Sequence, residues 1–95
     1  MDAHELLKRY AEGQRNFRSL DLKGLSFAKE NLSDIDFAGA LLNNADLSGT
    51  NLGNANLNWT MLKGANLTGA NLTGAKMPNG RLHNDHFEAA NYLGT

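Results

Sequence analysis

A large apolar residue recurs at every fifth position of this sequence, sixteen times without a gap. On an α-helix five residues advance roughly 500°, so successive apolar side chains would lie ~140° apart and form no stripe. On a straight strand they would alternate between faces, because five is odd. The chain therefore has to turn once in every five residues. The series is Phe17, Leu22, Phe27, Leu32, Phe37, Leu42, Leu47, Leu52, Leu57, Leu62, Leu67, Leu72, Met77, Leu82, Phe87 and Tyr92.

Each large residue belongs to a unit of the form A-(N/D)-L-x-G, clearest at residues 65–69 and 70–74. The small residue lies two positions before the large one, so an extended backbone points both side chains to the same side. The Asn or Asp between them then points outward. Gly or Asn follows where the chain must turn, and both tolerate a positive φ. The pattern predicts a coil with an apolar interior and a polar exterior.

These units resemble the pentapeptide-repeat family over roughly residues 15–94. The resemblance implies an all-β solenoid, a right-handed quadrilateral β-helix with four units per coil and about four coils. Residues twenty apart should then stack, and outward amides should form a ladder, since amides at strand spacing can bond to one another. The expected inner rows are Phe17–Phe37–Leu57–Met77, Leu22–Leu42–Leu62–Leu82, Phe27–Leu47–Leu67–Phe87 and Leu32–Leu52–Leu72–Tyr92. The expected ladder is Asn31, Asn51, Asn71 and Asn91.

The residues before the repeats predict a short α-helix over residues 2–12. Asp2 suits the N-cap, Glu5 completes a capping-box pattern, and Gly13 stands where a helix ends. Four apolar residues fall on one helical face, so the helix should dock on the open mouth of the β-helix. They are Ala3, Leu6, Leu7 and Tyr10.

We expect a single domain, with a helical cap over residues 1–14 and the β-helix over residues 15–95. In the first coil the inner small positions hold Leu20 and Leu25, which should fill the space beneath the helix. The opening segment is also similar to the leaders of short cyanobacterial members of the family.

No capping helix follows the last repeat, so the final coil should leave backbone groups and apolar side chains exposed. One interpretation is an end-to-end two-fold homodimer, an arrangement known for pentapeptide-repeat relatives. Its interface residues would be Leu82, Phe87, Tyr92 and Leu93. The other interpretation is a self-protected end, in which polar residues block the edge. Those residues are Pro78, Arg81, His83, Asp85, His86 and Glu88.

Leu41 and Met61 break the outward Asn/Asp rule, and they lie twenty residues apart, so they should stack. Trp59, the single Trp, falls at the adjoining corner, Arg81 should continue the same row, and Lys63 is near. Exposed Trp, Met and Leu beside a cation resemble the centre of a protein interface. The alternatives are scattered surface apolar groups or a Trp that covers a coil edge.

Other chemistry has little support in the sequence. The chain has no Cys, its three His lie near opposite ends, and no nucleophile has a base and an acid in reach. His83 and His86 should face different sides, so the run through Asp85 does not predict a metal site. We expect no catalytic residues, no cofactor and no enzyme activity. A net charge of −1 argues against direct nucleic-acid binding, and no apolar stretch suits a membrane span.

The sequence therefore predicts a non-enzymatic scaffold or protein-binding module, homodimeric, with an unidentified protein partner. A cytoplasmic location is the default in the absence of targeting signals. The family resemblance implies an alternative, because some pentapeptide-repeat proteins imitate duplex DNA and modulate type II topoisomerases. That role requires a long, strongly acidic rod, and the charge here is nearly balanced.

Overall fold

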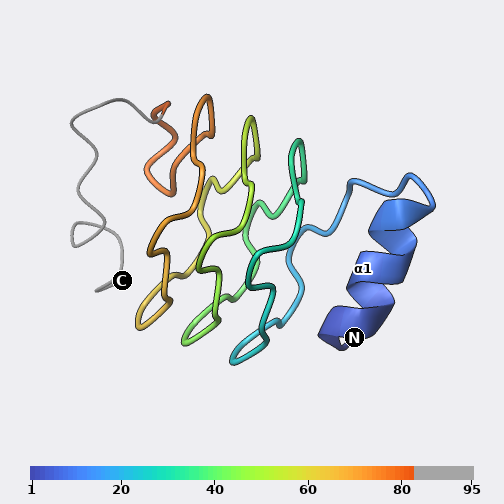
Figure 1. The fold of residues 1–95 in the computed structure, drawn as a ribbon. Helices are drawn as coiled ribbons and strands as arrows, with labels where there is room; N and C mark the ends of the chain where they lie inside the picture. Colours follow the sequence, from blue (N-terminus) through green and yellow to red (C-terminus); the bar gives the residue numbers. More distant parts are fainter. Residues whose placement is uncertain (83–95) are drawn as a thin grey trace.

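The computed structural model describes residues 1–82, which form an N-terminal helix followed by stacked four-sided coils (Figure 1). Backbone pairing joins residues that lie twenty positions apart. On one side Asn16 pairs in parallel with Asp36, Asp36 with Asn56, and Asn56 with Lys76. The predicted twenty-residue register is confirmed, and three successive coils run over residues 16–35, 36–55 and 56–75.

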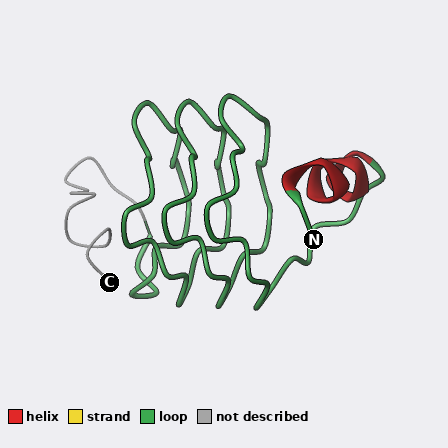
Figure 2. Cartoon of the chain, turned by 90° about the horizontal axis from the view of Figure 1, so that it is seen from below, coloured by secondary structure: helices red, strands yellow, loops and turns green. Residues whose placement is uncertain are grey.

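The other three sides repeat this arrangement, with one paired residue per side in each coil. The paired rows are Asp21–Leu41–Met61, Ser26–Asp46–Asn66 and Asn31–Asn51–Asn71. Each side is therefore a single bridge between coils and not a long strand. The view in Figure 2 shows the successive coils side by side, with similar outlines.

Every side ends in a tight turn, which explains why Gly and Asn recur. In a representative turn the N–H of Ala45 donates to the carbonyl of Leu42 at 3.0 Å. The third residue of that turn, Asn44, has a φ of 62°, and Gly49 has a φ of 65° in the next one. A positive φ costs Gly nothing and Asn little, because other side chains crowd the backbone in that region.

The outward Asn and Asp residues hold these turns through their side chains. Asn66 Oδ1 accepts the N–H of Thr68 at 3.0 Å, two residues later. This local bond satisfies a backbone donor that the turn would otherwise leave to solvent. The same bond is made by Asn16, Asp21, Asn31, Asp36, Asp46, Asn51, Asn56, Asn71 and Asn79.

The expected amide ladder is formed at one step within the described rows. Asn71 Nδ2 donates to Asn51 Oδ1 at 3.3 Å, whereas no side-chain bond joins Asn31 to Asn51. The prediction is wrong for the step from Asn31 to Asn51. The turn bond is not the reason, because Asn51 Oδ1 accepts both the N–H of Gly53 at 2.9 Å and the amide of Asn71. Asn91, the fourth expected member, lies outside the described residues.

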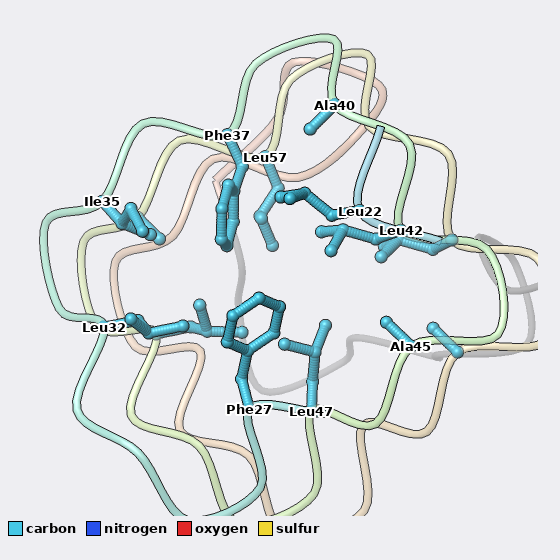
Figure 3. Packing of buried hydrophobic residues seen from close by; sticks show 14 of the residues in the cluster. Leu22, Phe27, Leu32, Ile35, Phe37, Ala40, Leu42, Ala45, Leu47 and Leu57 are labelled. Atoms are coloured by element: carbon cyan, nitrogen blue, oxygen red, sulfur yellow. The ribbon is translucent and has the colours of Figure 1, made fainter. Parts of the chain in front are cut away.

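The interior is filled by the apolar rows that the period predicts (Figure 3). From Phe17 to Met77 every large inner residue is buried. The rings of Phe27 and Phe37 lie 6.3 Å apart between centroids and are tilted by 48°. Two small inner positions hold Thr, and their hydroxyls are satisfied: Thr50 donates to the carbonyl of Phe27 at 2.7 Å and Thr60 to that of Phe37 at 3.2 Å. These bonds allow polar side chains inside the core.

Helix α1 runs over Ala3–Ala11 and begins with the expected N-cap. Asp2 Oδ1 accepts the N–H of Glu5 at 2.8 Å. The predicted capping box is only half formed, because the Glu5 carboxylate pairs with Arg9 Nε at 2.8 Å. An i,i+4 ion pair on the exposed helix face takes the place of the reciprocal cap bond.

The helix lies against the first coil and closes that end of the interior (Figures 1 and 2). Leu6 is fully buried and belongs to the apolar core, and Leu20 and Leu25 are partly buried against it. The Tyr10 hydroxyl donates to the carbonyl of Ser33 at 2.7 Å. The Arg15 guanidinium lies 3.7 Å from the centre of the Tyr10 ring. Apolar burial and these polar contacts fix the helix in place.

The chain leaves the repeat register after Pro78, whose carbonyl accepts the last register bond, from the N–H of Trp59. Lys76 pairs with Leu82 in antiparallel fashion, and the Met77 N–H donates to the carbonyl of Arg81 at 2.7 Å. The prediction that Leu82 continues an inner row is wrong, because its side chain is 67% exposed. The expectation that Arg81 continues the Leu41–Met61 row is also wrong, because Arg81 pairs with Met77 in the hairpin and not with Met61.

The turn over residues 77–80 accounts for this change of direction. Its left-handed residue is Gly80, with a φ of 82°, one position later than in the preceding turns. Pro78 in the second position and Gly80 in the fourth are typical of a type I turn, which reverses the chain into a hairpin. The fourth coil that the resemblance implies would require residues 83–95, which lie outside the described residues.

We predict that Leu6→Ala will lower the free energy of unfolding by about 2–5 kcal/mol, because it leaves a cavity under the helix. Urea titration followed by circular dichroism measures this change. Lys8→Ala on the exposed side of α1 is the control and should change the value by less than about 0.5 kcal/mol. Equal effects of the two substitutions would contradict the docked position of the helix.

Candidate protein-binding wall

Leu41, Trp59 and Met61 lie together on and beside one side of the β-helix, and we call them the apolar wall. Leu41 and Met61 are parallel-paired neighbours in successive coils. The Met61 N–H donates to the carbonyl of Ala40 at 3.0 Å, and the Met61 carbonyl accepts from Leu42 at 2.9 Å. Their side chains therefore lie one coil spacing apart on the outside. Leu41 is partly buried and Met61 is 40% exposed.

These two residues cannot make the side-chain bond that holds the other turns. Within residues 1–82, the N–H groups of Asn43 and Lys63 have no acceptor. A hydrogen bond of this kind contributes about 0.5–1.5 kcal/mol, so the fold gives up one such contribution at each position. Lys76 also replaces an Asn or Asp, but the residue two positions later is Pro78, which has no N–H to satisfy.

Trp59 departs from the pattern in a different way. It is the third residue of its turn, with a φ of 60°, where Gly or Asn usually stands. A left-handed backbone costs a bulky L-residue roughly 1–2 kcal/mol. Its N–H donates to the carbonyl of Pro78 at 3.0 Å, and its side chain is 71% exposed. The strain is therefore not compensated by burial of the indole in this chain.

The charges around the apolar wall differ between the end towards the N-terminal helix, next to Leu41, and the end towards the C-terminus, next to Met61. On the N-terminal side the cations are paired: Arg18 lies 3.7 Å from Asp36, and Lys23 lies 3.9 Å from Asp21. On the C-terminal side Lys63 follows Met61 by two residues. Among residues 1–82, no carboxylate lies within ion-pair distance of Lys63. That end is therefore positive.

The two acidic residues with shifted pKa values lie away from the apolar wall. The side-chain bond to Arg9 lowers the pKa of Glu5 on the helix. The Ser48 hydroxyl, at 2.6 Å, and the Ser48 N–H lower the pKa of Asp46 on another side of the coil. Both shifts favour the ionised carboxylate and come from local structural bonds. Neither group is a proton donor poised beside the apolar wall.

Within residues 1–82 no group of three or more metal-ligating side chains comes together. The one helix there is too short and too polar to cross a membrane.

Of the four residues predicted for the partner patch, the structure pairs Leu41 with Met61 across successive coils. Trp59 lies two residues before Met61, at the preceding corner. The hairpin carries Arg81 out of the Leu41–Met61 row. Of the predicted dimer interface, Leu82 is exposed. The remaining predicted residues lie outside the described range: Phe87, Tyr92 and Leu93 of the interface, and His83, Asp85, His86 and Glu88 of the polar end.

Sequence reasoning missed Lys76 as a neighbour of the apolar wall. The twenty-residue register could have placed it, since it stacks on Asn56 beside the corner of Trp59. It also missed the role of the outward Asn and Asp side chains in the turns. The sequence did contain a signal for these turn bonds. Each outward Asn or Asp stands two positions before the turn residue whose N–H it accepts, and this spacing is constant along the repeats.

The sequence matches the family model for pentapeptide repeats, described as eight copies, in overlapping segments that together span residues 16–87. The segments are 16–58, 31–69, 40–77 and 50–87. No curated protein matches the chain.

Solved structures of cyanobacterial pentapeptide-repeat proteins are similar to the chain. HetL of Nostoc sp. strain PCC 7120, involved in the regulation of heterocyst differentiation, is 34% identical with a TM-score of 0.61. The match covers 72% of this chain and 34% of HetL, so the chain spans about a third of that protein's length. The protein alr5209 of Nostoc PCC 7120 is 27% identical over 97% of this chain and 93% of its own, with a TM-score of 0.41. Rfr23 of Cyanothece 51142 is 24% identical over 68% and 61%, with a TM-score of 0.38.

Met61→Asn should raise the free energy of unfolding by about 0.5–1.5 kcal/mol, because it restores the bond to the Lys63 N–H. Trp59→Asn should raise it by about 1 kcal/mol, because Asn adopts the left-handed backbone at lower cost. Urea titration of each single variant measures these changes.

Asn66→Leu is the matched control on another side of the same coil. It removes the bond to Thr68 and should lower the free energy of unfolding by about 0.5–1.5 kcal/mol. A loss of stability in Met61→Asn would show that the methionine serves the fold.

Proposed function

We propose, from the premise that this chain belongs to the pentapeptide-repeat family, that it is a protein-binding module and that the apolar wall is its contact surface. Pentapeptide-repeat proteins fold as right-handed β-helices and are generally structural or binding modules. The observation that carries the proposal is the coincidence of three unfavourable local choices. Leu41 and Met61 each forgo a turn bond, and the adjoining Trp59 is both strained and exposed. Departures from local rules without a gain inside the fold are typical of functional positions.

The residue types at the apolar wall are those that carry binding energy in protein interfaces. Trp and Met are enriched at such contacts, and a few aromatic anchors dominate the affinity. The wall stands on paired coils and not on a free loop, so its backbone is held in place before binding. Such preorganisation lowers the entropic cost of association.

The DNA-mimicking role has no supporting observation. It would require carboxylates arranged along the walls of a long rod. The sequence contains no Asp or Glu from residue 47 to residue 82, whereas Lys63, Lys76 and Arg81 fall in that stretch. A wall with this charge would repel the DNA-binding surface that a mimic has to occupy.

Pairing of two chains through the C-terminal coil stays a prediction. The exposed side chain of Leu82 supports it. Light scattering over a wide concentration range should give twice the chain mass of 10.3 kDa, and Leu82→Asp with Phe87→Asp should halve the measured value. A mass of one chain at every concentration would rule out this dimer.

For the apolar wall, we predict that Trp59→Asn with Met61→Asn will abolish capture of its protein partner without lowering stability. Loss of one central hot spot costs at least about 2 kcal/mol, so the affinity should fall more than about thirtyfold. Comparative capture from a lysate, identification of the lost species and titration of that purified protein measure this effect.

Asn66→Ala, on another side of the same coil, is the control and should capture the partner as the unaltered chain does. A captured protein that binds the wall variant and the unaltered chain with equal affinity would place the contact surface elsewhere.

A further inference from the structure

We infer that the ligand of the apolar wall is a short acidic protein segment with at least one large apolar side chain. This inference rests on the proposed function and adds the chemistry and size of the partner. It follows from three observations: the charge around the wall, the state of its backbone, and the area that one side of the coil offers.

The charge comes from cations on both sides of the Trp59 corner. Lys63 follows Met61 at the next corner of the same coil, and it is exposed. Lys76 is exposed on the adjoining side, where it pairs through its backbone with Asn56. Among the described carboxylates, none forms an ion pair with either lysine. The cations at the other end, Arg18 and Lys23, are already paired.

The sequence around the apolar wall reinforces this asymmetry. No acidic residue occurs from residue 47 to residue 82, so no side chain of that stretch can neutralise the lysines. Complementary charge fixes orientation and excludes the wrong partners more than it adds affinity. An acidic segment satisfies both lysines, whereas a basic one is repelled by them.

The backbone groups of Leu41 and Met61 are not available to a partner. The Leu41 N–H donates to the carbonyl of Leu20 at 2.8 Å, and its carbonyl accepts from Leu22 at 2.8 Å. The corresponding groups of Met61 are also paired, with Ala40 and Leu42. A partner that lies across this face therefore contacts Leu41 and Met61 through side chains, by anchoring of its apolar groups beside the indole.

The area of one side favours a short segment over a second copy of the chain. Three coils about 4.8 Å apart, across a body 22 Å wide, present on the order of 300 Å². A stable protein interface buries about 800 Å² on each partner. A peptide or a single helix can use the smaller area, whereas a dimer of this chain through the apolar wall alone would fall well below the size of a stable interface.

To test this inference, peptides that bind the full chain are selected from a random peptide library. Counter-selection on the Trp59→Asn/Met61→Asn variant removes peptides that bind elsewhere on the chain. Enriched peptides should carry net negative charge and at least one aromatic or large aliphatic residue. Their affinity should fall at least about tenfold on the wall variant. It should also fall several-fold on Lys63→Gln/Lys76→Gln and weaken with added salt, as expected for exposed ion pairs. Lys29→Gln, at a different corner, is the matched control and should leave affinity unchanged.

The outcomes separate this inference from the proposed function. Peptides that bind the unaltered chain, lose affinity on the wall variant and are neutral or basic would overturn the acidic segment and leave the apolar wall as a binding surface. Peptides that bind the wall variant equally well, or a library from which nothing specific to the wall is recovered, would overturn both. A dimer that the wall substitutions dissociate would show that a second copy occupies the wall.

Discussion

The turn that closes each side of the coil is the element on which the rest of this structure depends. It bends the chain from one side of the coil to the next within four residues, needs one residue with a positive φ, and leaves a donor that the preceding Asn or Asp satisfies. Because the turns repeat at a constant interval, every coil has the same length and stacks on the one before. The apolar rows are buried as a consequence. A change of turn type at residues 77–80 is enough to take the chain out of register.

This dependence explains the unusual composition. Three positions of the repeat explain why Asn, Gly and Ala are abundant. Asn accepts the turn N–H, Gly adopts the positive φ, and Ala fits the small inner position. Large residues are confined to one inner position in five. The first coil, covered by α1, tolerates larger residues such as Leu20 and Leu25 because the helix and coil share them. Outside that region a residue that departs from the pattern weakens a turn, and the chain contains few such departures.

Much of the fold could be predicted from these rules, because they act over five residues at a time. The apolar period placed Phe17 to Met77 in the core, and Asp2 and Gly13 marked the ends of the helix closely. The hairpin was missed, although Pro78 and Gly80 stand where a type I turn requires them. Leu82 stands five residues after Met77, so the five-residue apolar period continues in the sequence through the hairpin. The period carries no information about the type of turn between the two residues. The amide ladder forms at one step only, and nothing in the sequence indicates which step that is.

The candidate site was predicted in part for a related reason. Leu41 and Met61 are visible as exceptions in a regular sequence, and the register places Trp59 beside them. Their cost to the fold was not predictable, because it depends on the turn bond and on the φ of Trp59. Arg81 was misplaced with the hairpin, and Lys76 was overlooked because it looked like an ordinary surface lysine. Residues twenty positions apart in sequence become neighbours in successive coils. The charges around a site can therefore be predicted only once the register of the coils is known.

We propose that the apolar wall departs from the repeat pattern for binding and at a cost to the fold. The most direct measurement is the free energy of unfolding of the chain in which Leu41, Trp59 and Met61 are all replaced by Asn. We predict that this variant is at least as stable as the unaltered chain, because two turn bonds are restored and one strained residue is relieved. A clear loss of stability would contradict it and would make these three residues part of the structural framework.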